Sequence, residues 1–481
     1  MGGKNEIKKV LLVSPRFNKG RHQISIHPLA GLGYIAESLK NNGFEVNVFD
    51  MNLQYSEKDL AEKIHSFLPD MVGFLIMTFG YKDTYRLIEG VKELEPNVKI
   101  AVGGPHISTL KEKVLQECSA IDYGVLLEGD KSFVRLCLND DVKNIPGIVY
   151  RAEGKIRKNE FNEFIENLNE LPFPRYEAFE LEKYPVKQIG IVTSRGCPYK
   201  CIYCPVVSAI GRKFRARNAD NIAEEIEYWH SKGYREILIL DDNFTLVRSR
   251  VEELCWLLIN KDLKDIRLKC PNGIRADKTD YELLKLMRKA RFDMISFGVE
   301  SASSKVLKNI NKDENIDVIE EAIKNACSLG FEVSLFFIIG SPGETPEDVQ
   351  KSFSLALKYP VAVSNFYNII PFPDTELFDW ISKNKYFLRP LEDIMNNASH
   401  FINEPCFFTP EMSYEERKRA FKNGKKISKI IRKRFIEKKL KGPEVLKRLF
   451  SCIYTIGVVE QVLTTNKSVI KLKEKLKQAV C

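Results

Sequence analysis

The stretch TSRGCPYKCIYC, residues 193–204, follows an apolar run and carries three cysteines, Cys197, Cys201 and Cys204. Three residues and then two separate them, so three thiolates on one tight loop can converge on a single metal centre. Three ligands fit a cubane iron–sulfur cluster with one open iron, whereas a closed structural zinc site requires a fourth ligand. The flanking residues Gly196 and Pro198 argue against three core cysteines that cluster by chance.

Residues 187–395 contain six apolar, strand-like segments separated by helical patterns. The segments are QIGIVTSRG, EILILDD, IRLKCPNGI, MISFGVES, VSLFFIIGSPG and SNFYNIIPFP. Six strand–helix units in about 200 residues predict a partial (β/α)6 barrel, whose active site lies at the carboxyl ends of the strands. The cysteine loop follows the first of these strands, which places it at that end.

Residues 1–150 also alternate between strand and helix patterns. The predicted strands are KKVLLVSP, FEVNVFD, MVGFLIMT, VKIAVGGPH and IDYGVLLEGD. This alternation predicts an α/β domain with a doubly wound parallel sheet, in which ligands bind beyond the carboxyl ends of the strands. Residues 151–186 read as a polar linker that ends in LPFPRY. Residues 396–481 read as a basic helical region that is interrupted by Gly442 and Pro443.

The composition is that of a globular chain of several domains, with 481 residues, 44% hydrophobic and 29% charged. The longest apolar runs stop short of the roughly 18 residues that a membrane helix needs. The start of the chain lacks the ordered charged, apolar and small-residue regions of a signal peptide. We therefore expect a cytoplasmic protein, whose eleven cysteines are thiols or metal ligands and not disulfides.

The net charge of +9 is concentrated near the end of the sequence, where residues 411–481 hold 20 Lys and Arg against seven Asp and Glu. Apolar residues recur at helical spacing among these cations and predict a basic amphipathic helix. They are Phe421, Ile427, Ile430, Ile431 and Phe435. Such a helix can pack on the barrel, lie peripherally on an anionic membrane or bind nucleic acid, the last being the weakest interpretation.

The cysteine spacing, with the aromatic residue Tyr203 before the third cysteine, resembles the radical S-adenosylmethionine superfamily. The resemblance covers residues 187–395. It implies that Cys197, Cys201 and Cys204 hold a 4Fe–4S cluster, whose open iron chelates the amino and carboxylate groups of S-adenosylmethionine. Reductive cleavage would then give a 5′-deoxyadenosyl radical that abstracts hydrogen from an unactivated carbon.

Three further segments match strand-end motifs of this superfamily. LDDNFT at 240–245 lies where the family contacts the amino group of S-adenosylmethionine, which assigns Asp241 to that contact, although the usual Gly-Gly-Glu is absent. FGVES at 297–301 would make Glu300 a ribose contact, and FIIGSPGET at 337–345 would place Ser341 near the adenine. Two interpretations stay open for Arg215 and Arg217: pairing with the carboxylate of S-adenosylmethionine, or a solvated charge run.

A doubly wound domain ahead of such a barrel is similar to the cobalamin-binding subgroup. Matching segments are GGPHIST at 103–109, LLEGDKSFVRL at 126–136 and the linker end LPFPRY. The resemblance implies that Gly103, Gly104 and His106 lie near the nucleotide tail of the corrinoid, and that Glu128 and Gly129 lie near its rim. No Asp-x-His-x-x-Gly motif occurs, so cobalt would have no His ligand from that motif.

These resemblances imply a cobalamin-dependent radical enzyme that methylates an unactivated carbon of a small-molecule or lipid-like substrate. A protein such as ferredoxin or flavodoxin would supply electrons. The alternative is a radical cyclase, or another enzyme that remodels C–C or C–H bonds, with the same two domains and no methyl transfer. A transfer-RNA methylthiotransferase is disfavoured because the N-terminal piece holds only Cys118 and Cys137, and not a second cysteine triplet.

Overall fold

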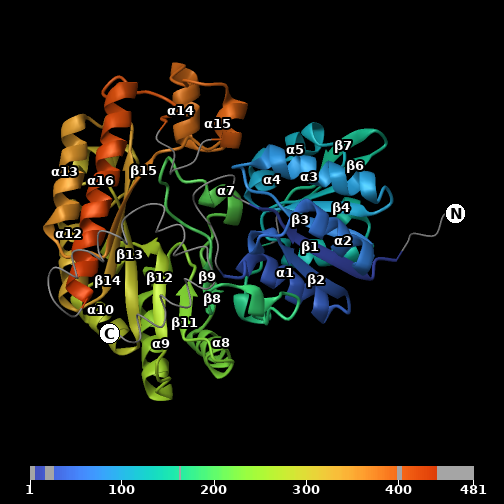
Figure 1. Cartoon of the computed structure of the whole chain (residues 1–481), viewed down its shortest axis with the longest axis horizontal. Helices are drawn as coiled ribbons and strands as arrows, with labels where there is room; N and C mark the ends of the chain where they lie inside the picture. The colour runs from blue at the N-terminus through green and yellow to red at the C-terminus, as the bar shows by residue number, and fades with distance from the viewer. Residues whose placement is uncertain (1–5, 17–26, 162–163, 398–403, 441–481) are drawn as a thin grey trace. The chain divides into compact units, whose positions relative to one another are not determined.

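The computed structural model describes residues 6–16, 27–161, 164–397 and 404–440 (Figure 1). The described residues up to Tyr184, together with Pro205–Ala216 and Met395–Asn397, form one compact unit. The remaining described residues form a second unit. Among the residues described, no helix combines the length and the apolar character needed to cross a membrane.

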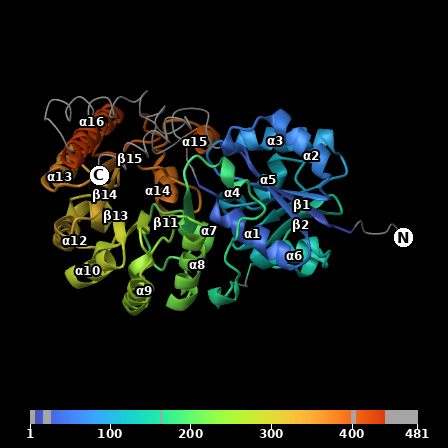
Figure 2. The ribbon, with the colours of Figure 1, turned by 60° about the horizontal axis from the view of Figure 1, so that its bottom comes forward.

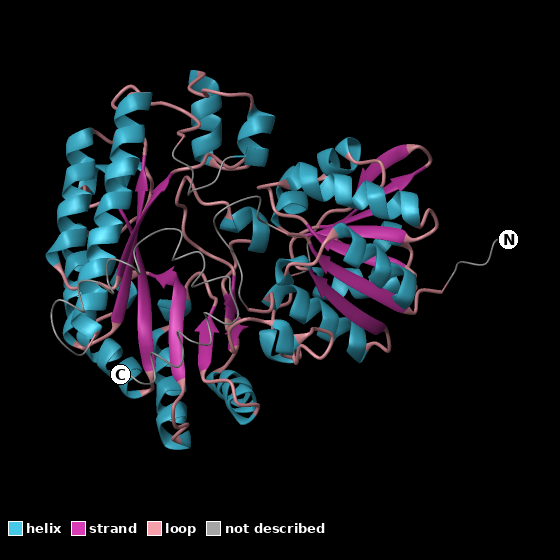
Figure 3. Ribbon diagram, viewed as in Figure 1, coloured by secondary structure: helices cyan, strands magenta, loops and turns pink. Residues whose placement is uncertain are grey.

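The first unit contains a seven-stranded sheet in the order β2-β1-β3-β4-β5-β6-β7 (Figure 3). The first five strands in the sequence are parallel. They are β1 Lys9–Ser14, β2 Glu45–Asp50, β3 Met71–Leu75, β4 Lys99–Gly103 and β5 Tyr123–Val125. The chain runs outward in opposite directions from β1 and β3, and ligands of such sheets bind at the switch point, beyond the carboxyl ends of the strands.

Helices cover both faces of this sheet, because its strands are buried on both sides. On one face, α1 Ala30–Asn41 packs against α6 Gly129–Cys137, and on the other α2 Glu57–Phe67 packs against α3 Tyr81–Leu94 (Figure 2). A capping box of Ser56 and Asp59 begins α2. Two short helices, α4 Pro105–Leu110 and α5 Glu112–Glu117, follow β4.

An antiparallel hairpin extends the sheet beyond β5. It consists of β6 Ile148–Ala152 and β7 Lys155–Lys158, joined by a turn in which Gly154 has φ +71°. The sequence predicts a linker from residue 151 onward, but Arg151 and Ala152 belong to β6 and pair with β7. The two strands are short and rich in charge, so their alternation is too weak to mark them as strands.

The second unit holds six parallel strands in the order β15-β14-β13-β12-β11-β8 (Figure 1). They are β8 Gln188–Ile191, β11 Glu236–Ile239, β12 Arg267–Ile274, β13 Phe292–Glu300, β14 Glu332–Ile339 and β15 Val363–Asn368. Each of the six segments predicted from the sequence forms one of these strands. Their order follows the sequence, which confirms the open (β/α)6 barrel.

Helices lie along the outside of the barrel sheet (Figure 2). They are α8 Ala219–Ser231, α9 Arg248–Lys261, α10 Tyr281–Lys289, α11 Ser304–Asn309, α12 Ile316–Ser328 and α13 Pro346–Lys358. Two more helices, α14 Glu376–Asn384 and α15 Leu391–Asn397, follow β15. A capping box of Thr345 and Asp348 begins α13, with Pro346 in its first turn.

The basic region begins with α16, Tyr414–Lys439, which packs on β15 and α13. Phe421 and Ile431 are buried. Gly424 approaches β15 so closely that a Cβ there would lie 2.7 Å from Cβ of Phe366. The described part of the region therefore packs on the barrel, as one of the three interpretations predicts. The predicted Gly-Pro break at 442–443 lies outside the described residues.

Candidate functional site

The three cysteines lie on the loop that follows β8 and the two-residue strand β9, Ser194–Arg195. All three are half-buried, and no disulfide joins them to one another or to another described cysteine. The backbone N–H of Cys204 donates to the carbonyl of Cys201 at 3.2 Å, so the second and third cysteines share one tight turn. Within the described ranges, no three His, Cys, Asp or Glu side chains are arranged around a common metal position. The loop thus offers three thiol donors without a preformed cage.

Backbone hydrogen bonds fix this loop to distant parts of the barrel unit. The N–H of Ile202 donates to the carbonyl of Ile310 at 3.2 Å, and the N–H of Leu377 donates to the carbonyl of Ile202 at 2.9 Å. Ile310 follows α11, and Leu377 lies in α14. Two remote segments therefore hold the chain between the second and third cysteines.

Asp241, which follows β11, is tied to the residues just before the cysteine loop. Its carboxylate accepts hydrogen bonds from the backbone N–H of Thr193, at 2.6 Å, and from the hydroxyls of Thr193 and Ser194. Arg250 lies 3.8 Å from the same carboxylate and donates to the carbonyl of Thr193 at 2.9 Å. The structure thus shows Asp241 positioning the start of the loop, and its predicted contact with S-adenosylmethionine stays a prediction.

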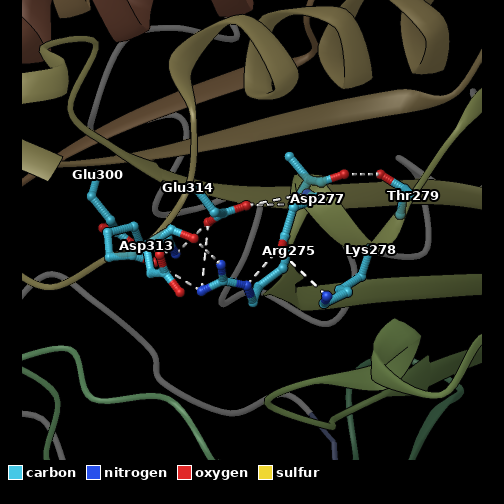
Figure 4. Close-up of polar contacts among 9 residues, drawn as sticks. Arg275, Asp277, Lys278, Thr279, Glu300, Asp313 and Glu314 are labelled. Atoms are coloured by element: carbon cyan, nitrogen blue, oxygen red, sulfur yellow. Dashed lines mark hydrogen bonds and ion pairs between the residues drawn. The ribbon is translucent and has the colours of Figure 1, made fainter. Parts of the chain in front are cut away.

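A group of charges, which we call the charged cluster, lies at the carboxyl ends of β12 and β13 (Figure 4). Its members are Arg275, Asp277, Glu300, Lys312 and Glu314. All are buried or half-buried except Asp277, which is exposed. The ammonium of Lys312 lies 3.4 Å from Glu300 and 3.3 Å from Glu314. Arg275 pairs with Asp277 at 2.9 Å and donates to the carbonyl of Lys312 at 2.9 Å.

Burial and pairing act against each other in the charged cluster. Desolvation lowers the pKa of Lys312, but the carboxylates of Glu300 and Glu314 more than offset this and raise it above its ordinary value. Desolvation raises the pKa of Glu314, although Lys312 and Arg275 oppose the shift. The cation of Lys312 is therefore held between two carboxylates.

Two tyrosines connect the charged cluster to the cysteine loop. The guanidinium of Arg275 lies 3.7 Å from the ring centroid of Tyr199, a cation–π contact. Tyr203 hydrogen-bonds to Glu300, and burial together with that carboxylate raises the pKa of Tyr203 well above its ordinary value. The predicted residues Tyr203 and Glu300 are thus brought together by the fold.

Glu300 has an unusual backbone conformation, with φ +63°. Its neighbour Gly298 is needed on steric grounds, because a Cβ there would lie 2.8 Å from the Glu300 carboxylate and 3.3 Å from the Lys312 ammonium. A positive φ in a residue other than Gly is uncommon and marks a position that the surrounding structure constrains. Here the constraint turns the Glu300 carboxylate toward Lys312.

Ser341 lies in the turn Gly340–Glu344 after β14, next to the strand that carries Glu300. It is fully buried, and its hydroxyl has no hydrogen-bond partner among the described residues. The turn is fixed by Glu344, which accepts from the N–H of Gly340 at 2.6 Å, and by Arg417 of α16, which donates to the carbonyl of Gly340 at 3.0 Å. Burial raises the pKa of Glu344 to about 7.

In the first unit, Gly103 and Gly104 end β4 at the carboxyl edge of the sheet. A Cβ on Gly103 would meet no atom within 4 Å, so open space lies beside its backbone. Gly104 has φ +103°, and a Cβ there would lie 2.5 Å from Leu75. Gly104 is therefore required by the turn itself, whereas Gly103 leaves room for a ligand.

His106 is fully buried within the first unit. Its Nε2 lies 3.0 Å from the hydroxyl of Tyr85, its Nδ1 lies 3.4 Å from the hydroxyl of Thr78, and its ring stacks on Tyr81. Desolvation lowers the pKa of His106 to about 3, so the ring is neutral near pH 7. Its predicted place near the corrinoid tail stays a prediction, and its ring nitrogens already face protein groups.

Glu128 and Gly129 lie where β5 leads into α6. The carboxylate of Glu128 is buried, pairs with Arg215 at 2.7 Å and accepts from the N–H of Ile165 at 2.9 Å. A Cβ on Gly129 would lie 3.1 Å from Ile35, so this glycine allows α6 to approach α1. Both residues are engaged within the unit, and their predicted contact with a corrinoid rim stays a prediction.

Arg215 and Arg217 are both buried, so they are not a solvated charge run. Arg215 pairs with Glu128, and Arg217 pairs with the buried Glu225 of α8. A carboxylate partner within the protein already neutralises each guanidinium. The structure thus shows both arginines in internal ion pairs, and the contact with the carboxylate of S-adenosylmethionine stays a prediction.

The sequence did not single out Arg275, Lys312, Glu314 or Arg417. Arg275 and Lys312 follow strands or helices in ordinary polar segments, NGIRADK and NINKDE. Arg275 donates to the carbonyl of Lys312, 37 residues away, and Arg417 donates to the carbonyl of Gly340, 77 residues away. No local pattern marks such residues.

Comparison with known families assigns both units. The family model of the radical SAM superfamily matches residues 191–356, and that of the B12 binding domain matches residues 24–137. The chain therefore contains a radical SAM domain and a B12-binding domain. This confirms the predicted family and its cofactors: S-adenosylmethionine, a 4Fe–4S cluster and cobalamin.

Two curated relatives match over most of their length. An uncharacterized methyltransferase of Pyrococcus horikoshii is 29% identical, over 92% of this chain and 95% of the relative. The anaerobic magnesium-protoporphyrin IX monomethyl ester cyclase of Rubrivivax gelatinosus is 27% identical, over 86% of this chain and 81% of the relative. Among solved structures, the cobalamin-dependent S-adenosylmethionine radical enzyme OxsB shares the fold, with a TM-score of 0.75 at 16% identity, over 98% of this chain and 75% of that one.

Proposed function

We propose that this enzyme methylates an unactivated carbon of a small-molecule substrate in a cobalamin-dependent radical reaction. The observation that carries the proposal is the cysteine triplet on a loop that the charged cluster contacts at the carboxyl edge of the barrel. The same chain also has a B12-binding domain. The similarity to a methyltransferase over 92% of the chain supports methyl transfer.

The residues present fit the cofactors. Three cysteines on one short loop match the three-ligand requirement of an open cubane cluster, and we assign Cys197, Cys201 and Cys204 to it. The open space beside Gly103, at the edge where doubly wound sheets bind ligands, suits the close approach of a large flat cofactor. When bound, the cluster supplies the electron that cleaves S-adenosylmethionine, and cobalamin carries the methyl group.

The chain's own residues would orient S-adenosylmethionine. The carboxylate of Glu300, turned inward by its backbone, is assigned to the ribose hydroxyls. The buried hydroxyl of Ser341, which has no partner among the described residues, is assigned to the adenine. Arg275 and Tyr199 keep the cysteine loop in register with Glu300. The barrel would shield the radical from water.

The experiment is an anaerobic assay of the reconstituted enzyme with S-adenosylmethionine, a chemical reductant and hydroxocobalamin. Methyl transfer predicts S-adenosylhomocysteine together with 5′-deoxyadenosine, because one S-adenosylmethionine donates the methyl group and another yields the radical. 5′-Deoxyadenosine without S-adenosylhomocysteine would contradict methyl transfer. Absence of both products, with an intact cluster, would contradict the radical assignment.

A second candidate, a radical cyclase, is favoured by the match to an anaerobic cyclase over 86% of the chain. It predicts 5′-deoxyadenosine alone in the same assay. S-adenosylhomocysteine that is labelled from S-adenosylmethionine and depends on cobalamin would exclude it.

The remaining partners are proposals of the same kind. A ferredoxin or flavodoxin would deliver the electron, since each cleavage consumes one. A lipid-like substrate and a peripheral membrane contact would now depend on residues 441–481, which lie outside the described residues, because α16 packs on the barrel. Co-sedimentation of the full chain and of a 1–440 chain with anionic vesicles tests the contact, and equal sedimentation of both would contradict it.

A further inference from the structure

The segment directly after the third cysteine folds with the first unit and not with the barrel. This segment, Pro205–Ala216, contains α7, Val206–Ile210, and the two-residue strand β10, Arg215–Ala216. It lies outside residues 24–137, which match the B12 binding domain. A single peptide bond therefore joins Cys204 to a part of the first unit.

A buried ion pair anchors the end of this segment. The side chains of Arg215 and Glu128 are 3% and 4% exposed and lie 2.7 Å apart. Arg215 also donates to the carbonyl of Ile165 at 2.9 Å, and its guanidinium lies 4.8 Å from the ring centroid of Phe164. Breaking a buried pair leaves an uncompensated charge, which is strongly unfavourable. The segment is thus an integral part of the first unit.

Both attachments of the segment lie at the edge where doubly wound sheets bind ligands. Helix α7 packs on α4, which begins directly after Gly103 and Gly104. Arg215 reaches Glu128, which follows the neighbouring strand β5. The segment therefore runs from the carboxyl end of β4 to that of β5.

The side chains of α7 are unusual for a helix in the core of a domain. Its sequence is VVSAI, yet none of its residues is buried. Met77, after β3 at the same edge of the sheet, is 38% exposed. Partly exposed apolar side chains gathered at a ligand-binding edge mark a binding surface. An apolar, flat macrocycle is the partner that this edge fits.

We propose that Pro205–Ala216 forms part of the cobalamin site, and that the Arg215–Glu128 pair holds it there. The inference rests on the proposed function, since it requires that cobalamin binds. As a consequence, residues of the cobalamin site and of the cysteine loop adjoin in the sequence, because Pro205 follows Cys204 directly. Arg215 is then a positioning residue for the cobalamin site.

The first test is amide hydrogen exchange of the full chain with and without hydroxocobalamin. The amides of α7 and Gly211 should exchange at least about tenfold more slowly when hydroxocobalamin is bound, because the ligand covers them. Amides of α10, in the barrel unit, serve as the internal control and should not change. Unchanged exchange in α7, while the absorption spectrum shows bound hydroxocobalamin, would overturn the inference.

The second test is the double variant Glu128→Gln with Arg215→Gln, which removes both charges without leaving one unpaired. Its dissociation constant for hydroxocobalamin, measured by equilibrium dialysis, should rise at least about tenfold. The control is Lys58→Gln, which breaks an exposed ion pair with Glu62 on α2 of the same unit, outside the segment, and should leave the affinity unchanged.

The outcomes separate the two proposals. If the unaltered chain does not retain hydroxocobalamin, the cobalamin part of the proposed function fails and this inference falls with it. If it does retain hydroxocobalamin, and the folded double variant binds with the same affinity, only the inference is overturned. Should the double variant fail to fold, the exchange of α7 in the unaltered chain decides.

Discussion

The carboxyl edges of the two parallel sheets differ in what they expose. In the first unit, the polar residues that the sequence analysis singled out contact other residues of the same unit. His106 contacts Tyr85 and Thr78, and Glu128 pairs with Arg215. Backbone at Gly103 and the apolar side chain of Met77 remain accessible. This edge presents surface to a large flat ligand.

In the barrel unit, the edge is charged. Glu300, Lys312 and Arg275 are gathered beside the cysteine loop, and the buried hydroxyl of Ser341 has no partner among the described residues. Such an edge presents paired charges and hydrogen-bonding groups to a small polar ligand. The carboxyl edge of a parallel sheet can therefore present open, partly apolar surface in one unit and paired charges in the other.

The largest effect is expected at the cysteine loop. Changing Cys197, Cys201 or Cys204 to Ala should abolish S-adenosylmethionine cleavage and reduce iron content, because three thiolates are the minimum for the open cluster. The matched control is Cys327→Ala in α12, another half-buried free cysteine, which should keep about four irons per chain. Normal S-adenosylmethionine cleavage in any of the three variants would contradict the assignment of the cluster to the barrel edge.

The next effect concerns the turn that presents Ser341. Arg417→Ala should lower the free energy of unfolding by about 3 kcal/mol, because the carbonyls of Gly340 and Phe407 lose their donor inside the protein. Thermal unfolding of the cluster-free protein measures this. Arg419→Ala, two residues further along α16 and exposed, is the control. Equal midpoints for the two variants would show that Arg417 does not hold the turn.

A smaller effect is expected from acid in the first unit. His106 gains its proton near pH 3 when folded but near 6.5 when unfolded, so below about pH 6.5 the unfolded chain binds more protons and stability falls. Lowering the pH from about 7 to about 5 should cost roughly 2 kcal/mol through this residue.

Urea unfolding at the two pH values, followed by circular dichroism, measures that cost. His106→Gln should remove this part of the pH dependence, whereas His65→Gln, at a position with a 73% exposed side chain, should not. The same acid dependence in His106→Gln and in the unaltered chain would contradict the internal role of His106.

The smallest effect on stability is expected at Gly103, which can be compared with its neighbour Gly104 in the turn after β4. Gly103→Ala should change stability by less than about 0.5 kcal/mol, because its Cβ meets open space, yet it should weaken hydroxocobalamin binding. Gly104→Ala should cost about 1 kcal/mol or more, because φ is +103° and Leu75 is in the way. Equal hydroxocobalamin affinity in Gly103→Ala and the unaltered chain would remove this glycine from the cobalamin site.

The parallel strands of both sheets and the cysteine triplet could be predicted from the sequence. All six barrel strands and the first five strands of the other sheet were predicted, because apolar residues recur in each, in a run or in alternation, between turn residues. The spacing of Cys197, Cys201 and Cys204 is likewise local, so ligand chemistry could be inferred from it directly. The resemblance to a family then supplied Tyr203 and Glu300, which the fold brings into contact.

Only the tertiary structure decided which charges pair and where the segment after Cys204 belongs. Arg215 meets Glu128 across 87 residues of sequence, and Arg417 meets Gly340 across 77. No local sequence pattern marks such pairs. A buried charged side chain needs a partner of opposite charge or a hydrogen-bonding group, and that partner can lie far away in the sequence. For the same reason the sequence did not single out Arg275, Lys312 and Glu314, the partners that the structure places around Glu300.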